Sequence, residues 1–219
     1  MKKFNFLCLF FVLFLTSFGQ NNNPSQSFNE KLKYSRMGLY FSPCINFIHT
    51  NTHAETKSNL GIVYGYAIEM SLNKNHYIES GFSITYKGGD ITQNITITNI
   101  DKTGKTEQEV TTITSDYKVE YLTLPFLIKM RSREIGHFHY FAKIGPSINL
   151  KIKDMITSED KARFISIDLS IFLGAEYSLG GKTSIESSIF FTNNITNSIA
   201  NNNMHALFHQ LGLRLGFLF

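Results

Sequence analysis

The sequence contains little cysteine, no tryptophan and no long hydrophobic segment after its N-terminus. Cys8 and Cys44 are the only cysteines among 219 residues, and Cys8 lies inside an N-terminal apolar run. A framework of intramolecular disulfides is therefore excluded, and Cys44 is expected to be an ordinary small strand residue. No later stretch approaches the about 20 apolar residues that a membrane-spanning helix needs. Any membrane insertion would have to use β-strands.

Charge of either sign is also scarce. The chain has 21 Lys and Arg against 17 Asp and Glu, for a formal charge of +4. This balance is too weak to indicate a nucleic-acid partner. The sequence contains no phosphate-binding glycine loop. His49, His53 and Glu55 come closest to metal-ligand spacing, but they fall in a segment typical of a solvated loop. We therefore expect no metal and no cofactor.

The first twenty residues read as an export signal. Lys2 and Lys3 form a basic region, residues 6–15 are apolar, and small residues precede an expected cleavage near Gly19 or Gln20. We expect residues 1–20 to be a signal peptide and residues 21–35 to be a polar periplasmic leader. Residues 36–219 are expected to form a single domain.

From Arg36 onward, apolar and polar residues alternate with the period of two that half-buried strands require. Eight segments follow this pattern, at about 36–47, 59–71, 76–87, a segment ending at 130, 138–150, 165–179, 183–191 and 207–219. The connections at 72–75, 131–136 and 180–181 are short, whereas those at 48–58, 88–106, 151–162 and 192–206 are long and polar. The sequence therefore predicts an all-β fold, an eight-stranded antiparallel transmembrane β-barrel with short periplasmic turns and long extracellular loops.

A soluble ligand-binding barrel would show the same alternation with its apolar face turned inward. The apolar face here is almost free of charge, as lipid requires, because a charge at mid-bilayer costs about 2–4 kcal/mol on such a barrel. The polar face is rich in glycine, which a narrow packed interior needs. These glycines are Gly38, Gly61, Gly65, Gly81, Gly145, Gly174, Gly212 and Gly216. We therefore place the apolar face outside, against outer-membrane lipid, with both termini periplasmic.

Two stretches resemble a known family. Residues 121–129 (YLTLPFLIK) and 141–146 (FAKIGP) are similar to the "YLxIPLLLK … GP" pattern of the PorT-like outer-membrane barrels of Bacteroidota. The closing GLRLGFLF, with its terminal Phe219, resembles the C-terminal signal of outer-membrane barrels. The resemblance covers nearly the whole chain after the export signal. It implies a small porin-like or secretion-associated barrel and carries over no catalytic residue. Pro125 cannot donate a ladder hydrogen bond, so a bulge or an unpaired site is expected there.

Eight ionisable residues fall on the glycine-bearing face, in the half of the strands nearest the short turns. They are Arg36, Glu69, Glu79, Lys129, Lys143, Glu176, Glu186 and Arg214. Unpaired charges are costly in a narrow interior, so these four bases and four acids are expected to pair across strands. A structural plug is the favoured interpretation. A selective polar conduit is the alternative, although an eight-stranded barrel is only wide enough to be filled by side chains.

The main functional hypothesis is a non-enzymatic barrel that serves as a structural or accessory subunit of an envelope complex for secretion or uptake. It would act through its extracellular loops, and its partners would be outer-membrane lipid and other envelope proteins. The segment 88–106 is the expected contact loop, with alternating isoleucines that predict a hairpin continuing beyond the membrane. The candidate contact residues are Asp90, Ile91, Ile95, Ile97, Asp101 and Lys102. The alternatives are a narrow channel for ions or small solutes and a lipid-modifying enzyme that uses His209 with a loop serine.

Overall fold

The structure, a computed structural model, describes residues 35–50, 55–73, 75–100, 106–154, 162–198 and 206–219, without the side chains of 93–100 and 106–113. The expected signal peptide (1–20) and residues 21–34 of the expected leader lie outside these residues. None of the described residues forms a helix long and apolar enough to cross a membrane.

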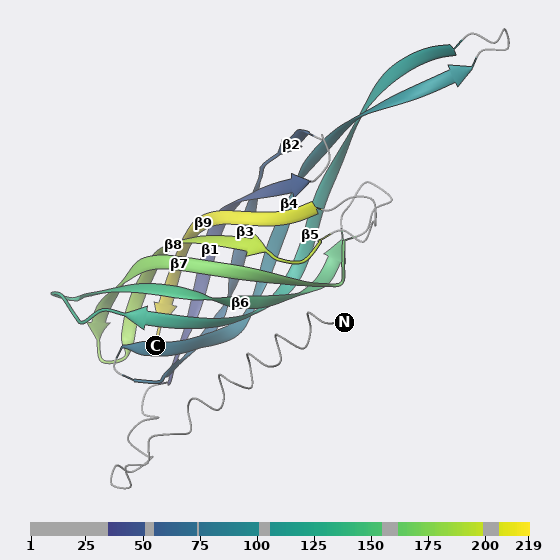
Figure 1. The fold of residues 1–219 in the computed structure, drawn as a ribbon. Helices are drawn as coiled ribbons and strands as arrows, with labels where there is room; N and C mark the ends of the chain where they lie inside the picture. The colour runs from purple at the N-terminus through teal and green to yellow at the C-terminus, as the bar shows by residue number, and fades with distance from the viewer. Residues whose placement is uncertain (1–34, 51–54, 74, 101–105, 155–161, 199–205) are drawn as a thin grey trace. The chain divides into compact units, whose positions relative to one another are not determined.

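The described residues form nine antiparallel strands in one sheet. They are β1 (Ser35–Thr50), β2 (Glu55–Lys57), β3 (Asn59–Ser71), β4 (His76–Ile100), β5 (Thr106–Arg131), β6 (Phe138–Asp154), β7 (Ile165–Gly180), β8 (Thr183–Asn194) and β9 (Ala206–Leu218). The order is β2-β4-β3-β1-β9-β8-β7-β6-β5, and a β4–β5 pairing closes it. Eight long strands thus make a closed barrel, and β2 adds to β4 above the barrel wall (Figure 1). The predicted eight-stranded barrel is confirmed.

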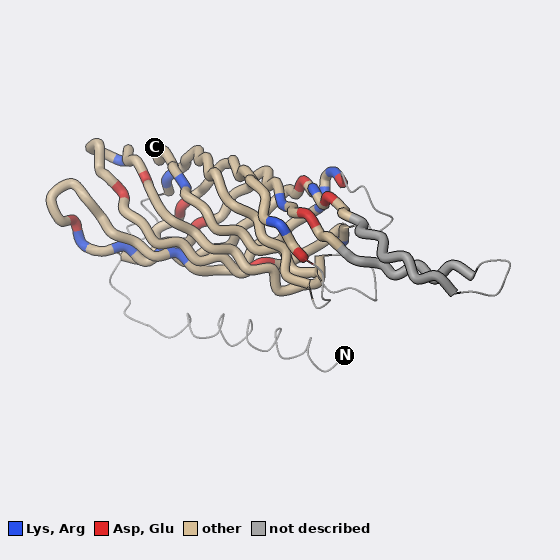
Figure 2. The backbone as a smooth tube through the Cα atoms, turned by 90° about the horizontal axis from the view of Figure 1, so that it is seen from above, with Lys and Arg blue, Asp and Glu red and all other residues tan. Residues whose placement is uncertain are grey.

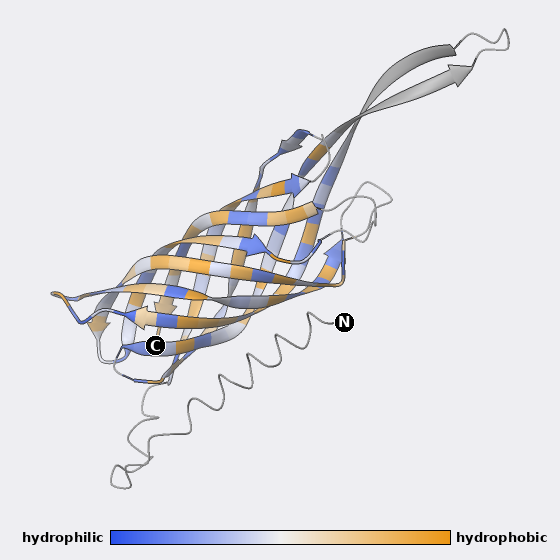
Figure 3. Cartoon of the chain, viewed as in Figure 1, coloured by the Kyte–Doolittle hydropathy of each residue, from blue (hydrophilic) through white to orange (hydrophobic). Residues whose placement is uncertain are grey.

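Among the described side chains, those of the eight long strands alternate between the interior and the outer surface. The pattern is clearest on β8, where buried and exposed residues alternate from Ser184 to Asn194. The outward residues are large and apolar, and Leu39, Ile189 and Leu213 are 59%, 55% and 56% exposed. Figure 3 shows this alternation as orange and blue bands along the strands. The β4–β5 pairing closes the barrel and leaves no free edge strand in its wall, so this apolar exterior can face lipid with most backbone groups paired.

Pro125 marks a local interruption of the β4–β5 ladder, as predicted. The pairs Ser80↔Phe126 and Ser83↔Thr123 lie on either side of it, with no pair between them. The Ser80 hydroxyl donates to the Pro125 carbonyl over 3.0 Å. Because the register is the same on both sides, this site is unpaired without being a bulge. The register of β5 against β6 shifts instead between Glu120 and Tyr121.

The prediction of a loop was wrong for residues 88–100, which belong to β4, and the hairpin predicted for the same segment is confirmed. Strands β4 and β5 remain paired from His76↔Met130 to Ile100↔Thr106. On their other sides, β4 pairs with β2 only as far as Thr92, and β5 pairs with β6 only as far as Val119. The pairs from Gln93↔Ile113 to Ile100↔Thr106 therefore form a two-stranded ribbon that extends beyond the rest of the sheet (Figure 1). We call this segment the β4–β5 ribbon.

The interior is filled in layers. Next to the short turns lie the charged side chains described below. Above them is a waist layer of Cys44, Leu127, Phe172 and Phe190. At the ribbon end is a mouth layer of Ile48, Ile91, Tyr117, Ala206 and Phe208. Inward glycines make this packing possible, because a Cβ on Gly212 would lie 2.4 Å from the Pro43 carbonyl oxygen and 2.8 Å from the Phe190 ring.

Candidate functional site

Each of the eight barrel strands contributes one of the eight predicted charged side chains to a cluster inside the short-turn end. In strand order from β1 to β9, without β2, they are Arg36, Glu69, Glu79, Lys129, Lys143, Glu176, Glu186 and Arg214. All eight are buried. The period-two alternation turns each of them inward, and neighbouring strands bring them to one level. The structure thus brings together every residue of the predicted cluster, as ion pairs across strands.

Lys129 lies at the centre of one half of this cluster. Its ammonium donates to Glu69 Oε1 over 2.5 Å, to Glu176 Oε2 over 2.9 Å and to Glu186 Oε2 over 3.1 Å. The side chain is completely buried, and the nitrogen lies 4.6 Å from the centre of the Phe141 ring. An ammonium has three donors, so each of its hydrogens has a carboxylate partner.

Lys143 and Arg214 organise the other half. Lys143 donates to Glu186 Oε1 over 2.7 Å and also bonds to Glu79. Arg214 donates to the second oxygen of Glu79 over 2.9 Å. The Arg214 guanidinium also stacks 3.7 Å from the centre of the Tyr40 ring, which is a cation–π contact. Glu186 therefore links the two lysines, so the halves form one network.

Arg36 closes the network at the short turns. Its guanidinium donates to Glu69 Oε2 and to Glu176 Oε1, each over 2.5 Å. A fifth cation, Arg131, was not predicted. It donates to Glu176 over 3.2 Å and also bonds to the hydroxyl of Tyr77. Arg131 follows Lys129 by two residues on β5, so the period alone would have placed it inward, but it was assigned to a turn. Five cations thus surround four carboxylates.

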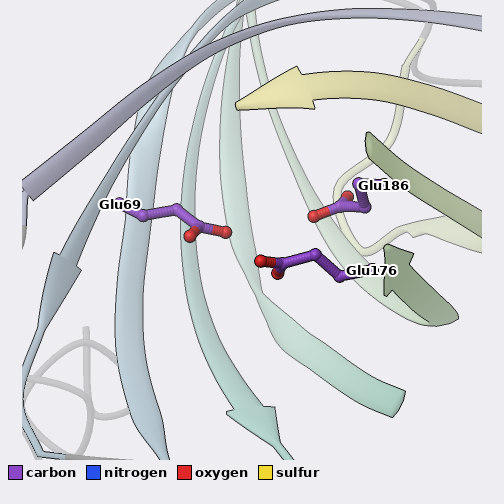
Figure 4. A group of neighbouring side chains, drawn as sticks. All are labelled: Glu69, Glu176 and Glu186. Atoms are coloured by element: carbon purple, nitrogen blue, oxygen red, sulfur yellow. The ribbon is translucent and has the colours of Figure 1, made fainter. Parts of the chain in front are cut away.

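The three carboxylates around Lys129 are also close enough together to suggest a metal site. Oxygens of Glu69, Glu176 and Glu186 lie within 4.8 Å of one another, and Figure 4 shows the three side chains converging from separate strands. However, the Lys129 ammonium bonds to all three and takes the place that a metal cation would need. The geometry is that of an internal ion-pair network, and it requires no added ion.

A second buried ion pair lies nearer the ribbon end and was also missed. Lys87 of β4 bonds to Asp168 of β7 across the interior, and both side chains are excluded from solvent. The Lys87 nitrogen lies 5.5 Å from the centre of the Tyr121 ring. Both charged residues have the inward phase of their strands, which could have revealed them. Figure 2 shows charged residues gathered toward the two ends of the strands.

Between the two ionic levels is a cavity of about 50 Å³ lined mainly by hydroxyl and amide side chains. It has room for a few water molecules. Ser42, Thr85, Asn149 and Gln210 contribute to its polar lining. Leu127, Phe172 and Phe190 of the waist layer line this cavity on the side of the charge cluster. The cavity is small compared with the continuous aqueous space that a channel would need.

The predicted contact residues of segment 88–106 differ in their environments. Ile91 is 2% exposed and packs in the mouth layer, so its assignment to an exposed contact surface was wrong. Asp90 is half-buried, and its backbone is the ladder partner of Lys57 on β2. Ile95 and Ile97 lie on β4 within the ribbon, but their side chains are outside the described set. Asp101 and Lys102 lie outside the described residues.

His209, the residue considered for catalysis, lies on the outward side of β9. Its ring stacks on Phe191 at 6.3 Å between centres and lies 6.5 Å from the ring of His49. The Nδ1 atom has no hydrogen-bond partner among the described residues. Within that part of the chain His209 therefore has neither the carboxylate nor the serine contact that a nucleophilic triad requires.

The comparisons with known proteins agree with this architecture. A family model described as an outer membrane protein beta-barrel domain matches residues 18–206. The chain belongs to this family. As an outer-membrane barrel it is a bacterial protein whose apolar exterior contacts lipid. No curated protein gave a match.

One solved structure shows the same fold at low sequence identity, and two others are also similar to this chain. The outer membrane protein OprG from Pseudomonas aeruginosa is 10% identical, with a TM-score of 0.50, and the alignment covers 86% of this chain and 97% of that one. Neisserial surface protein A is 9% identical, with a TM-score of 0.45 and coverage of 82% and 95%. Ail, the attachment invasion locus protein of Yersinia pestis, is 11% identical, with a TM-score of 0.39 and coverage of 84% and 99%. At 10% identity the likeness to OprG concerns the fold alone.

Proposed function

We propose that this outer-membrane barrel is a non-enzymatic structural or accessory subunit of an envelope complex and that the β4–β5 ribbon contacts its partner. The termini and short turns would be periplasmic and the ribbon extracellular. The observation that carries the proposal is the contrast between a filled interior and a ribbon extending past it. The resemblance of residues 121–129 and 141–146 to PorT-like barrels of Bacteroidota supports a secretion-associated complex.

The filled interior argues against a conducting pore. Charged, apolar and polar layers follow one another from the short turns to the mouth, and the cavity between them measures about 50 Å³. Removing a buried charge from its partners is costly, so the ion-pair network resists opening. We expect the purified protein in planar lipid bilayers to give no steady unitary current. Such currents would instead support the narrow channel considered from the sequence.

The ribbon offers backbone groups for recognition. Beyond Thr92 on β4 and Val119 on β5, each strand has a ladder partner on one side only among the described residues. Unpaired strand edges are sites where another chain can add a strand. The sequence of the ribbon is rich in threonine and isoleucine, which favour extended structure.

A ribbon deletion tests the proposal without cutting the barrel. Thr92 and Thr114 are cross-strand partners at the base of the ribbon, so a two-residue Asn-Gly turn can join them in place of residues 93–113. We expect the shortened protein to reach the outer membrane but to lose the proteins that co-purify with the full chain from detergent-solubilised membranes. Unchanged co-purification would contradict the role of the ribbon. Protease cleavage of the ribbon on intact cells tests its extracellular placement.

A further inference from the structure

The barrel wall is interrupted between β3 and β4 near the ribbon end. The ladder between these strands ends at Val63↔Thr85, and β4 next pairs on this side through Asp90, with Lys57 of β2. Residues 86–89 of β4 therefore have no ladder partner on β3, although β1 still pairs with β3 as far as Asn59. We call this interruption the wall gap.

Two amide side chains from inside the barrel compensate for the missing backbone bonds. Asn46 Nδ2 donates to the carbonyl oxygen of Tyr86 over 3.3 Å, and Gln210 Nε2 donates to the same oxygen over 3.2 Å. Asn46 also donates to Asn59 Oδ1 over 2.9 Å. A buried carbonyl without a donor would destabilise the wall. These side-chain bonds allow the gap to persist as a built feature of the fold.

A cavity of about 380 Å³ occupies the wall gap. Its size is within the range of small-molecule pockets, about 300–1,000 Å³. Its lining combines inward residues with outward residues. The inward ones include Asn46, Lys87 and Val119, and the outward ones include Leu60, Ile62 and Lys118. In a fully paired wall, successive side chains of a strand point to opposite faces of the sheet. A single cavity lined by inward and outward side chains must therefore extend into the wall between β3 and β4.

The lining has one apolar side and one polar, cationic side. Leu60 is 86% exposed, so the gap has an apolar side that is open toward lipid. Lys118 lies beyond Leu122, where the apolar outer face of β5 gives way to Glu120 and Lys118. The gap is therefore at the edge of the apolar belt, where an amphiphile can keep its chain in lipid and its polar end in water.

Of the two lysines that line the cavity, Lys118 is the one that can exchange its partner for a carboxylate of a ligand. Its ion pair with Asp116, 2.7 Å long, has side chains that are 57% and 40% exposed. Asp116 raises the pKa of Lys118 above its usual value, so the ammonium stays charged. An exposed pair contributes little and exchanges easily. Lys87, in contrast, is held by its buried pair with Asp168.

We propose that the wall gap binds a single-chain amphiphile of the fatty-acid type, with its chain along Leu60 and Ile62 and its carboxylate at Lys118. The amide of Asn59 also lines the gap and offers a further polar contact. On its inner side the cavity is bounded by the buried side chains of Asn46, Lys87 and Val119. This function goes beyond partner contact by the ribbon and does not depend on it.

The chain has no tryptophan, so single tryptophans can report on the site. Leu60→Trp places the reporter at the gap, and Leu169→Trp places a control on the outward face of β7, across the barrel. Each full-length protein, in non-ionic detergent micelles, is titrated with a stearic acid brominated at mid-chain, since bromine quenches tryptophan on contact. The methyl ester of the same acid is titrated in parallel, and far-UV circular dichroism checks folding.

We expect saturable quenching of the Leu60→Trp reporter alone, by the acid and not by the ester. Adding Lys118→Gln should raise the half-saturating concentration by about two- to fivefold, as loss of an exposed ion pair implies. Lys153→Gln, an exposed lysine on β6 outside the gap, should leave it unchanged. Equal and unsaturated quenching of both reporters would overturn the site. Saturation that Lys118→Gln does not alter, or that the ester reproduces, would overturn the fatty-acid assignment.

Discussion

The Lys129 ammonium and the Glu69 carboxylate lie 2.5 Å apart, and neither side chain is exposed to solvent. They come from β5 and β3, on either side of β4, so the bond spans the interior across an intervening strand. Lys129 also bonds to glutamates of β7 and β8. One ammonium thus connects four of the eight barrel strands, which makes it the most consequential single side chain of the charge cluster.

Replacing Lys129 by methionine should destabilise the barrel by about 3–5 kcal/mol, because three buried carboxylates lose a cation. The measurement is urea unfolding of the protein in lipid vesicles. Lys153→Met removes an exposed lysine from β6 and should change the unfolding free energy by less than about 0.5 kcal/mol. Adding Glu69→Gln to Lys129→Met should restore part of the loss. Equal effects of the two lysine variants would contradict the network.

The Lys87–Asp168 pair allows a cleaner separation of charge from packing. Either Lys87→Met or Asp168→Leu alone leaves an unpaired buried charge and should be strongly destabilising. The double variant should recover most of the loss, since apolar residues often replace a buried pair without cost. A coupling energy of about 0.5–3 kcal/mol is expected from the double-mutant cycle. Additive single effects would show that the pair does not interact.

The sequence was sufficient for the strands and for the side of the wall that each residue faces. Period-two alternation can be seen in each strand alone. When the barrel closes, one face of every strand becomes the interior and the other becomes the outer surface. This is why all eight predicted charges lie together in the interior. The bonds among them could not be predicted, because which strands lie opposite depends on the tilt and stagger of the closed barrel.

The ribbon shows where the same reasoning gives two answers. Segment 88–106 is polar and rich in threonine, which predicted a loop, whereas its alternating isoleucines predicted the hairpin. A two-stranded ribbon has no interior and needs no strong contrast between its faces. The wall gap was equally hidden, because the pairing of β3 with β4 stops at Val63↔Thr85 without any break in the alternation of either strand.

Two glycines on β9 provide a matched test of interior packing. A Cβ on Gly212 would lie 2.4 Å from a carbonyl oxygen and 2.6 Å from the Cβ of Cys44, whereas a Cβ on Gly216 would meet nothing closer than 3.6 Å. Gly212→Ala should therefore cost about 1–3 kcal/mol through overpacking. Gly216→Ala should be neutral or stabilise by up to about 1 kcal/mol, because alanine restricts the unfolded chain. Vesicle unfolding of both variants decides the point, and equal costs would contradict the packed interior.

The position of the lipid can be tested along the same strand. Leu213 is 56% exposed at the middle of the outward face of β9, and Leu207 is near its ribbon end. Leu213→Lys should cost about 2–4 kcal/mol, whereas Leu207→Lys should cost about 0–1 kcal/mol, because the penalty falls toward the membrane surface. Urea unfolding in vesicles measures both. Equal unfolding costs of the two lysine variants in vesicles would show that Leu213 does not lie near the bilayer centre.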